Sequence, residues 1–472
     1  MSSFGTTSKE TNSHWLLASL VALVGVFMAF LDSNAVNVAI TSMMNDFNTT
    51  AAGIEWVTTS YLLTAAIVLP LSGWLNAKFG SKTLYLWCLG IFTFGSVLCG
   101  LAWNLETLTL ARILQAVGGG MLMSTVMSMV FRLIPKDKMG LGMGIVGIAM
   151  MVAPAIAPTL GGVLVEYASW RWIFWINLPV GVLGLIGGAS VLPNFQDHKT
   201  AIKFDWLGAI LSAVSFGALL YSLSKANEWG WTSRVTWLAL AGSLAVLAVL
   251  IAYQLKATNP LLDLSVFRDR NFTLTMGILV IANLGIVSGL FYIPIFVQTI
   301  QGHSALDTGL LLLPSALVSA IFMPISGRLY DKAGAKAVLT IGILLLALTT
   351  WLLSGITGDT DLLTLNIWLV VRGIAMGMMP FQAAALENLA TPQVPQATAI
   401  LQIVRNLSGA FGIAFMTALM TTLIGTYGNG VEKNTQAFVH SLQDVFRWTI
   451  PLIVLALVPV FLMKSKKDTK NT

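Results

Sequence analysis

Long apolar stretches separated by short polar breaks run through almost the whole chain. Each stretch has about 20 residues or more, which is the length that an α-helix needs to cross ~30 Å of hydrocarbon. The pattern therefore predicts an all-α polytopic membrane protein. The fourteen expected transmembrane spans are residues 15–42, 53–75, 83–102, 106–131, 139–166, 172–192, 206–225, 235–255, 272–300, 306–327, 336–356, 362–389, 397–424 and 446–464.

Basic residues alternate between the predicted loops. If the N-terminus is cytoplasmic, the inside segments hold 18 lysines and arginines and the outside segments hold 5. Loops rich in Lys and Arg stay on the cytoplasmic side of a membrane, so we predict that both termini are cytoplasmic (N-in, C-in). Three more arginines, Arg112, Arg372 and Arg405, fall inside spans.

Composition agrees with this class and argues against others. Apolar residues make up 56% of the 472 and charged residues 10%, against about 25% charged in soluble domains. The net charge of +6 does not indicate nucleic-acid binding, because the one basic tract is the C-terminal tail, which suits anionic lipid headgroups. The four histidines are scattered and no Gly-Lys-Ser/Thr phosphate loop occurs, so we expect no metal site, no cofactor and no enzyme. Without a phosphate loop the chain cannot use ATP itself, so any transport that it performs is driven by an ion gradient or by the gradient of the substrate.

Two polar segments share one sequence pattern. The segments 73–82 and 327–336 both fit G-x-L-x-x-K-x-G-x-K and begin 254 residues apart, and Arg112 and Arg372 lie 260 residues apart. The chain is thus predicted to be a duplicated six-helix unit, and transporters built from such repeats bind substrate between their halves. The expected parts are an N-terminal tail (1–14), a six-helix bundle (15–192), a linker with two extra helices (193–271), a second six-helix bundle (272–464) and a basic tail (465–472).

Asp32 is a lone carboxylate inside the first span. A charge at this depth costs free energy and indicates a functional site. The simplest species that the carboxylate could carry is a proton. Arg112 is predicted at nearly the same depth in the fourth span. A facing arginine favours the charged carboxylate whereas burial favours the neutral one, and this competition suits a group that binds a proton in one state and releases it in another. The alternative is a structural ion pair that joins the two helices.

The fifth span carries residues that shape a helix. Pro154 and Pro158 interrupt its backbone hydrogen bonds, and Gly161 with Gly162 allows a neighbour to approach closely. We expect this helix to bend and to pack tightly against another helix.

Several motifs occur in a fixed order along the chain. They include a loop signature between spans two and three, a first-helix motif around Asp32, and an R-x-x-Q-x-x-G pattern in span four. The chain thereby resembles the major facilitator superfamily, and within it the fourteen-helix drug:proton antiporters of the EmrB/QacA type. The resemblance implies two six-helix bundles plus two inserted helices. The matching segments are 31–39, 73–82, 112–118, 144–162, 170–179, 204–208 and 260–264.

The resemblance also implies which residues serve conformational change. It assigns gating to the repeated loop motif, and it implies that the fifth helix limits proton leakage during exchange. One position departs from the signature: Ala77 stands where the equivalent position of the second copy, Asp331, retains the aspartate. The resemblance implies that this aspartate helps to hold the cytoplasmic gate closed. We therefore expect this closing contact, the cytoplasmic latch, to be weaker in the first half. The expected gating residues are Gly73, Gly80, Lys82, Pro154, Pro158, Gly161, Gly162, Gly327, Asp331 and Gly334.

Substrate identity is weakly encoded. Methionines crowd spans four, five and twelve, and flexible thioethers suit a cavity for many shapes; the alternative is that they face lipid or other helices. Glu55 and Asp307 lie near outer helix ends, where a solvated helix cap is favoured, although Glu55 could meet substrate at the outer mouth. Arg405 is expected to be structural and Glu387 interfacial. The candidate cavity residues are Glu55, Met123, Tyr292, Gln298, Arg372 and Phe381.

The leading hypothesis is a secondary-active exporter in the bacterial cytoplasmic membrane, in which inward proton movement through Asp32 drives lipophilic drugs or toxic compounds outward. The alternatives are a carrier for one physiological solute (a metabolite, siderophore or lipid) and a non-transporting receptor or scaffold. The expected partners are protons, small lipophilic substrates and membrane lipid, with the protein acting as a monomer. The resemblance adds a periplasmic adaptor and an outer-membrane channel in two-membrane bacteria, although only residues 425–445 form a long predicted outer loop.

Overall fold

The computed structural model describes residues 7–135, 139–195, 205–230, 233–257, 260–389, 393–427 and 433–463, and no strand occurs within these ranges. The predicted basic tail lies outside the described residues, and of the predicted N-terminal tail only the backbone from Thr7 is described. The first half of the molecule consists of α1 (Thr7–Asp46), α2 (Ala51–Val68), α3 (Leu71–Phe79), α4 (Ser81–Gly100), α5 (Leu105–Leu133), α6 (Met139–Tyr167), α7 (Trp172–Trp175) and α8 (Asn177–Val191). The remaining helices are α9 (Trp206–Trp229), α10 (Arg234–Gln254), the 3₁₀ turn η2 (Leu264–Arg268), α11 (Arg270–Ile295), the π-helical turn η3 (Phe296–Ile300), α12 (Ala305–Leu353), α13 (Leu362–Gly377), α14 (Phe381–Leu386), α15 (Val394–Tyr427), α16 (Lys433–Leu455) and α17 (Leu457–Leu462).

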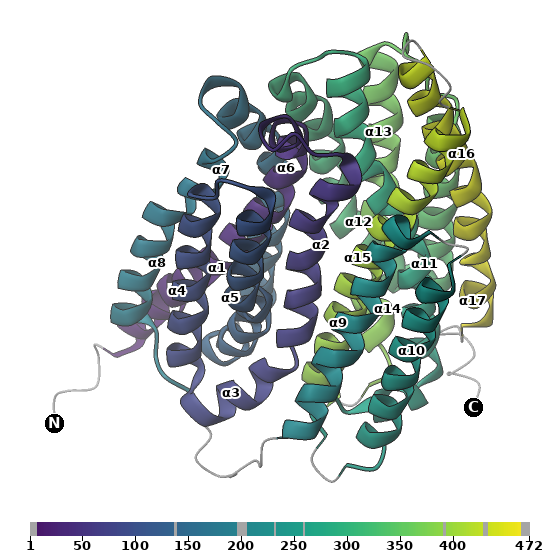
Figure 1. Cartoon of the computed structure of the whole chain (residues 1–472). Helices are drawn as coiled ribbons and strands as arrows, with labels where there is room; N and C mark the ends of the chain where they lie inside the picture. The colour runs from purple at the N-terminus through teal and green to yellow at the C-terminus, as the bar shows by residue number, and fades with distance from the viewer. Residues whose placement is uncertain are drawn as a thin grey trace, which may run out of the picture.

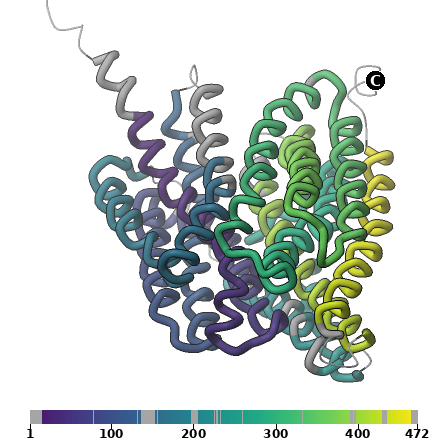
Figure 2. The backbone as a smooth tube through the Cα atoms, turned by 90° about the horizontal axis from the view of Figure 1, so that it is seen from above, coloured from purple at the N-terminus to yellow at the C-terminus, as the bar shows by residue number. Residues whose placement is uncertain are grey.

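The helices form two halves that lie side by side. Helices α1 to α8 make the first half and α11 to α17 the second, as Figures 1 and 2 both show. The hairpin of α9 and α10 packs on α2 and α15, one helix from each half. The start of α1 and the end of α17 lie at the same face, the lower face in Figure 1. We use "lower face" and "upper face" in that sense; which of them is cytoplasmic stays a prediction.

The apolar pattern locates the helices well. Within the described residues, 13 helical stretches are long and apolar enough to cross a membrane, and the described apolar part of α6, Val152–Tyr167, is shorter. The chain is thus multi-pass, and the count of fourteen spans stays a prediction. One expectation is wrong: the segment 425–445 is not a long loop, because α16 begins at Lys433.

The repeated motif has the same backbone conformation in both copies. Gly80 ends α3 with φ +82° and ψ 155°, and Gly334 interrupts α12 with φ +80° and ψ 169°. Side chains are almost excluded from this region of φ and ψ. A Cβ on Gly80 would also overlap the amide of Asn194. Gly327, the first glycine of the second copy, has open space around it and does not need to be glycine for steric reasons. The geometry thus requires glycine at Gly80 and Gly334, and the duplication extends to the backbone.

Replacing Gly334 with alanine is expected to destabilise the protein by about 1–3 kcal/mol, because alanine must adopt a glycine-only conformation. Gly327→Ala in the same helix is the matched control, and it should be neutral because nothing lies within 4 Å of the added methyl group. The Tm of both purified variants in detergent checks this. Equal Tm values for the two would contradict the assignment.

The two halves touch closely near the upper face. There α6 meets the start of α12: a Cβ on Gly309 would overlap the carbonyl oxygen of Pro158, and one on Gly162 would lie 2.5 Å from the Ala305 oxygen. Thr159 Oγ1 donates to the Gly309 oxygen at 3.3 Å, and Gln298 Nε2 donates to the Val38 oxygen at 3.0 Å. Such close helix contacts depend on small residues. We call this set of contacts the upper seam.

Candidate functional site

A buried ion pair joins α1 and α5. Asp32 is 0% exposed and Arg112 is 1% exposed, and Arg112 Nη1 lies 2.5 Å from Asp32 Oδ2. The start of α5 is fixed by a capping box in which Asn104 and Thr107 bond each other's backbone and side chain. Arg112 follows within two turns of this cap, at a depth where it can reach the carboxylate of α1.

Two amides complete the coordination of the carboxylate. Gln115 Nε2 donates to Asp32 Oδ1 at 3.0 Å and Asn177 Nδ2 donates to the same oxygen at 3.1 Å. Asn177 also donates to Ser96 Oγ at 2.9 Å, so the network links α1, α4, α5 and α8. With the Arg112 guanidinium on Oδ2, both oxygens of the carboxylate accept hydrogen bonds from buried donors. The structure thus shows Asp32 in an environment built for a negative charge.

Neither amide was assigned a role from the sequence. Gln115 stands three residues after Arg112 and therefore on the same helix face, which is a signal that could have found it. Asn177 is a single amide within the apolar segment 172–186, and nothing in the pattern shows which way it points. We call Asp32, Arg112, Gln115 and Asn177 the carboxylate network.

Arg112 is held from several sides. Its Nη1 donates to Gln115 Oε1 at 2.7 Å and its Nε donates to the Val57 oxygen at 3.3 Å. The guanidinium lies 4.3 Å from the centre of the Tyr61 ring and 5.7 Å from that of Phe174, and such faces attract a cation. The arginine can therefore keep its position when the charge on Asp32 changes.

A cavity of about 130 Å³ lies beside the network and between the two halves. Arg112 lines it, and Asp32 is the chain neighbour of another lining residue, Ser33. A molecule in this cavity would contact the guanidinium that binds Asp32, so occupancy and the charge on the carboxylate are physically coupled. The full lining is Ser33, Asn37, Thr58, Tyr61, Leu62, Arg112, Val287, Leu290, Phe291 and Ile413.

Glu55 is not the solvated cap that we favoured. Its side chain is 1% exposed, and the N-cap of α2 is Thr50, whose side chain accepts from the Gly53 amide. Glu55 lies one turn before the cavity residue Thr58 and interacts electrostatically with Tyr292 of the second half. For Asp307 the cap is confirmed, because it forms a capping box with Ser304 at the start of α12.

The other candidate cavity residues lie elsewhere. Arg372 donates to the oxygen of Gly285 and to Thr350 Oγ1 inside the second half. Phe381 is buried in the core of the second half, and Met123 packs partly buried against the core of the first. None of these three lines the cavity beside Arg112, and a role for them in substrate binding stays a prediction.

Two further candidates connect elements near the cavity. Tyr292 is buried and donates to Thr417 Oγ1 at 3.0 Å, which ties α11 to α15. Gln298 lies in the upper seam. Glu387, expected at the interface, accepts from the Tyr330 hydroxyl at 2.7 Å.

The gating candidates form mainly structural contacts. Lys82 Nζ donates to the Ala189 oxygen at 2.6 Å and so ties α4 to α8. Pro154 and Pro158 lie inside α6, and Gly161 approaches Ala35 of α1. The side chains of Ala77 and Asp331 lie outside the described part of the structure, so the expected difference between the two latches stays a prediction.

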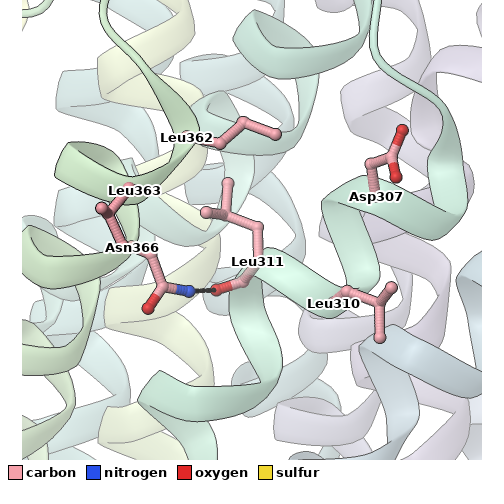
Figure 3. Close-up of a pocket in the computed structure, with 6 residues that line it drawn as sticks. All are labelled: Asp307, Leu310, Leu311, Leu362, Leu363 and Asn366. Carbon is pink, nitrogen blue, oxygen red and sulfur yellow. Dashed lines mark hydrogen bonds between the residues drawn. The ribbon is translucent and has the colours of Figure 1, made fainter.

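A second hollow of about 290 Å³ opens between the starts of α12 and α13 (Figure 3). Asn366 Nδ2 donates to the Leu311 oxygen at 3.1 Å there, and the Asp307 carboxylate lies apart from that amide. Leu310 is 48% and Leu363 70% exposed. This hollow therefore belongs to the outer surface of the bundle and has no link to the carboxylate network.

Comparisons with known proteins find relatives along most of the chain. The model of the Major Facilitator Superfamily matches residues 22–413. The chain is 35% identical to an uncharacterized MFS-type transporter, YhcA of Bacillus subtilis, over 93% of this chain and 84% of that protein. It is 31% identical to the lincomycin resistance protein LmrB of the same organism, over 98% of each chain. A multidrug resistance protein B homolog of Mycobacterium tuberculosis is 31% identical over 85% of this chain and 75% of its own length.

Solved structures share the fold. A mutant of the nucleoside transporter NupG superposes with a TM-score of 0.65 at 13% identity, covering 94% of this chain and 99% of its own. A bacterial homolog of the human lysosomal transporter Spinster, inward-facing and unoccupied, has a TM-score of 0.65 at 16% identity, covering 95% and 97%. At such identities the likeness concerns the fold alone.

Proposed function

The chain belongs to the major facilitator superfamily, and on that premise we propose that it is a proton-coupled exporter of lipophilic drugs or other toxic compounds across the bacterial cytoplasmic membrane. That it is a multi-pass membrane transporter and not an enzyme follows from the family. The finer proposal rests on one observation. The buried pair of Asp32 and Arg112 stands beside a cavity between the halves, and Arg112 belongs to both.

The proposed coupling uses the carboxylate network. When Asp32 is ionised, Arg112, Gln115 and Asn177 all donate to it. A proton on Asp32 removes the charge that balances Arg112 and permits one access state, whereas substrate binds the deprotonated protein, in which the carboxylate holds Arg112 in the lining of the cavity. Proton and substrate thus exclude each other, which gives the exchange of proton for substrate that an antiporter requires.

Alternating access then requires the upper seam to open and close. In this structure α6 and α12 are in close contact there, and Gln298 bonds α1 across it. Rocking of the halves about the cavity would break these contacts and open the path to the upper face. We further propose that the protein acts as a monomer. An adaptor and an outer-membrane channel stay predictions for two-membrane cells.

The test is transport by the purified protein in proteoliposomes with an acidic lumen. We expect lincomycin to accumulate in the lumen above the level of protein-free vesicles as protons leave it, and nigericin, which collapses the pH gradient, to abolish this excess. Accumulation that ignores nigericin would refute proton coupling. Growth of a pump-deficient strain on unrelated dyes and antibiotics separates an exporter of many compounds from a carrier of one solute.

A further inference from the structure

Arg405 lies inside the membrane-spanning part of α15, and the space around its side chain is not filled by neighbouring residues. It stands eleven residues after Val394, or about 16 Å along the helix axis from the start of α15. Its side chain is exposed although it lies deep within the bundle. Among the described residues its guanidinium has no hydrogen-bond or ion-pair partner. The expected structural role of Arg405 therefore has no side-chain hydrogen bond or ion pair among the described residues to support it.

Its neighbours place Arg405 at the boundary between the halves. One turn above it, Gly409 lies 3.5 Å from both Asn283 of α11 and Leu62 of α2, measured from an added Cβ. Two turns above it, Ile413 lines the cavity. The Asn283 amide donates to the Arg405 carbonyl at 2.9 Å. Figure 1 shows α15 between α2 and α11 accordingly. Arg405 therefore lies below the cavity, between it and the lower face.

The three arginines inside spans differ in the hydrogen-bond and ion-pair partners of their guanidinium groups. Arg112 binds Asp32, and Arg372 is surrounded by a carbonyl and a hydroxyl of its own half. Arg405 has neither kind of partner within the described structure. An unpaired guanidinium is costly in lipid, so this one must be hydrated within the bundle. A hydrated cation on a transport path is a contact for any passing group that accepts hydrogen bonds.

The cavity above it has matching chemistry. Its polar lining consists of hydroxyls, an amide and the Arg112 guanidinium, and no lining residue carries a carboxylate. The carboxylate of Asp32 is turned toward its three donors. A lipophilic cation that enters from below meets positive charge first, whereas an anion meets a complementary group.

We propose that Arg405 is a substrate-binding residue and that it selects compounds with an anionic or strongly hydrogen-bond-accepting group over lipophilic cations. The proposal rests on the proposed function in one respect, because it takes the boundary between the halves as the substrate path. It narrows the substrate class that the function left open.

The experiment uses two probes of nearly equal shape and opposite charge, tetraphenylborate and tetraphenylphosphonium. Their binding to the purified full-length protein is measured by equilibrium dialysis in an uncharged detergent, with empty micelles subtracted. We expect the protein to bind tetraphenylborate about ten-fold more tightly, as one charge-assisted contact allows. Arg405→Gln should remove this preference, and Arg405→Lys should retain part of it because the charge stays while the planar fork is lost.

Arg268→Gln is the matched control, since it removes one positive charge from the exposed end of η2. It should leave the preference intact. Tighter binding of the phosphonium by the wild type, or an unchanged preference in Arg405→Gln, overturns the proposal. Tm values confirm that the variants are folded, and the wild-type comparison decides even if they are not. Because no gradient is present, failure of proton coupling leaves this result unaffected, and the two proposals fail separately.

Discussion

Asp32→Asn is expected to abolish export driven by a pH gradient. Asparagine keeps the shape of the side chain and an oxygen that can accept from Gln115 and Asn177, but it cannot carry a proton at any working pH. In proteoliposomes, substrate accumulation should therefore fall to the level of empty vesicles. Substrate binding at equilibrium should weaken but remain measurable, because asparagine resembles the protonated carboxylate whereas Arg112 still lines the cavity.

The variant also removes the partner of a buried charge. Breaking a buried ion pair in this way costs about 3–5 kcal/mol, and here Gln115 Oε1, the Val57 carbonyl and the Tyr61 ring still hold Arg112. We therefore expect a lower Tm with a folded, monodisperse protein. Asp32→Glu keeps an ionisable group and should recover part of the transport, which a purely structural role would not predict.

The matched control is Asp307→Asn at the start of α12, a half-exposed cap whose loss should leave transport unchanged. Gradient-driven accumulation that survives in Asp32→Asn would show that the proton takes another route. The pair would then be the structural link between α1 and α5 that the sequence left open as the alternative.

Much of the fold could be predicted because lipid imposes a simple rule on the chain. Apolar runs long enough to span it must be helical, and they marked nearly every helix within a few residues. The start of α16 was missed for a physical reason. Residues 433–445 include Lys433, His440 and Asp444, so hydropathy marks them as polar, although their backbone continues the helix beyond the apolar part.

The site was predictable only where charge made it conspicuous. Asp32 and Arg112 stood out because charges are rare inside spans, and their depths agreed. Neutral amides carry no such signal, so Asn177 could be found only through the packing of α8 against α1 and α4. The direction of a side chain is equally hidden: the sequence places Glu55 and Arg405 on their helices, but which neighbours they face depends on how the two halves pack.

Gly309→Val is expected to stop transport because it prevents α6 and α12 from making contact at the upper seam. Even a Cβ at Gly309 would overlap the Pro158 oxygen and lie 3.0 Å from the Cα of Thr159, so valine cannot fit unless α12 and α6 separate. These helices belong to different halves, and steric overlap of backbone atoms is not relieved by a change of rotamer. The variant should thus occupy the state with separated upper ends and transport at less than about a tenth of the wild-type rate.

Gln298→Cys reports the state of the upper seam, because Gln298 bonds Val38 across it. A membrane-impermeant maleimide should label this cysteine several-fold faster when Gly309→Val is also present. Gly327→Val is the control in the same helix, where an added Cβ has nothing within 4 Å, and it should change neither labelling nor transport. If Gly309→Val transports normally, the contact of α6 with α12 does not have to close during the cycle. Slow labelling together with lost transport would instead mean that the variant is trapped with the seam shut, which the overlap at Pro158 makes unfavourable.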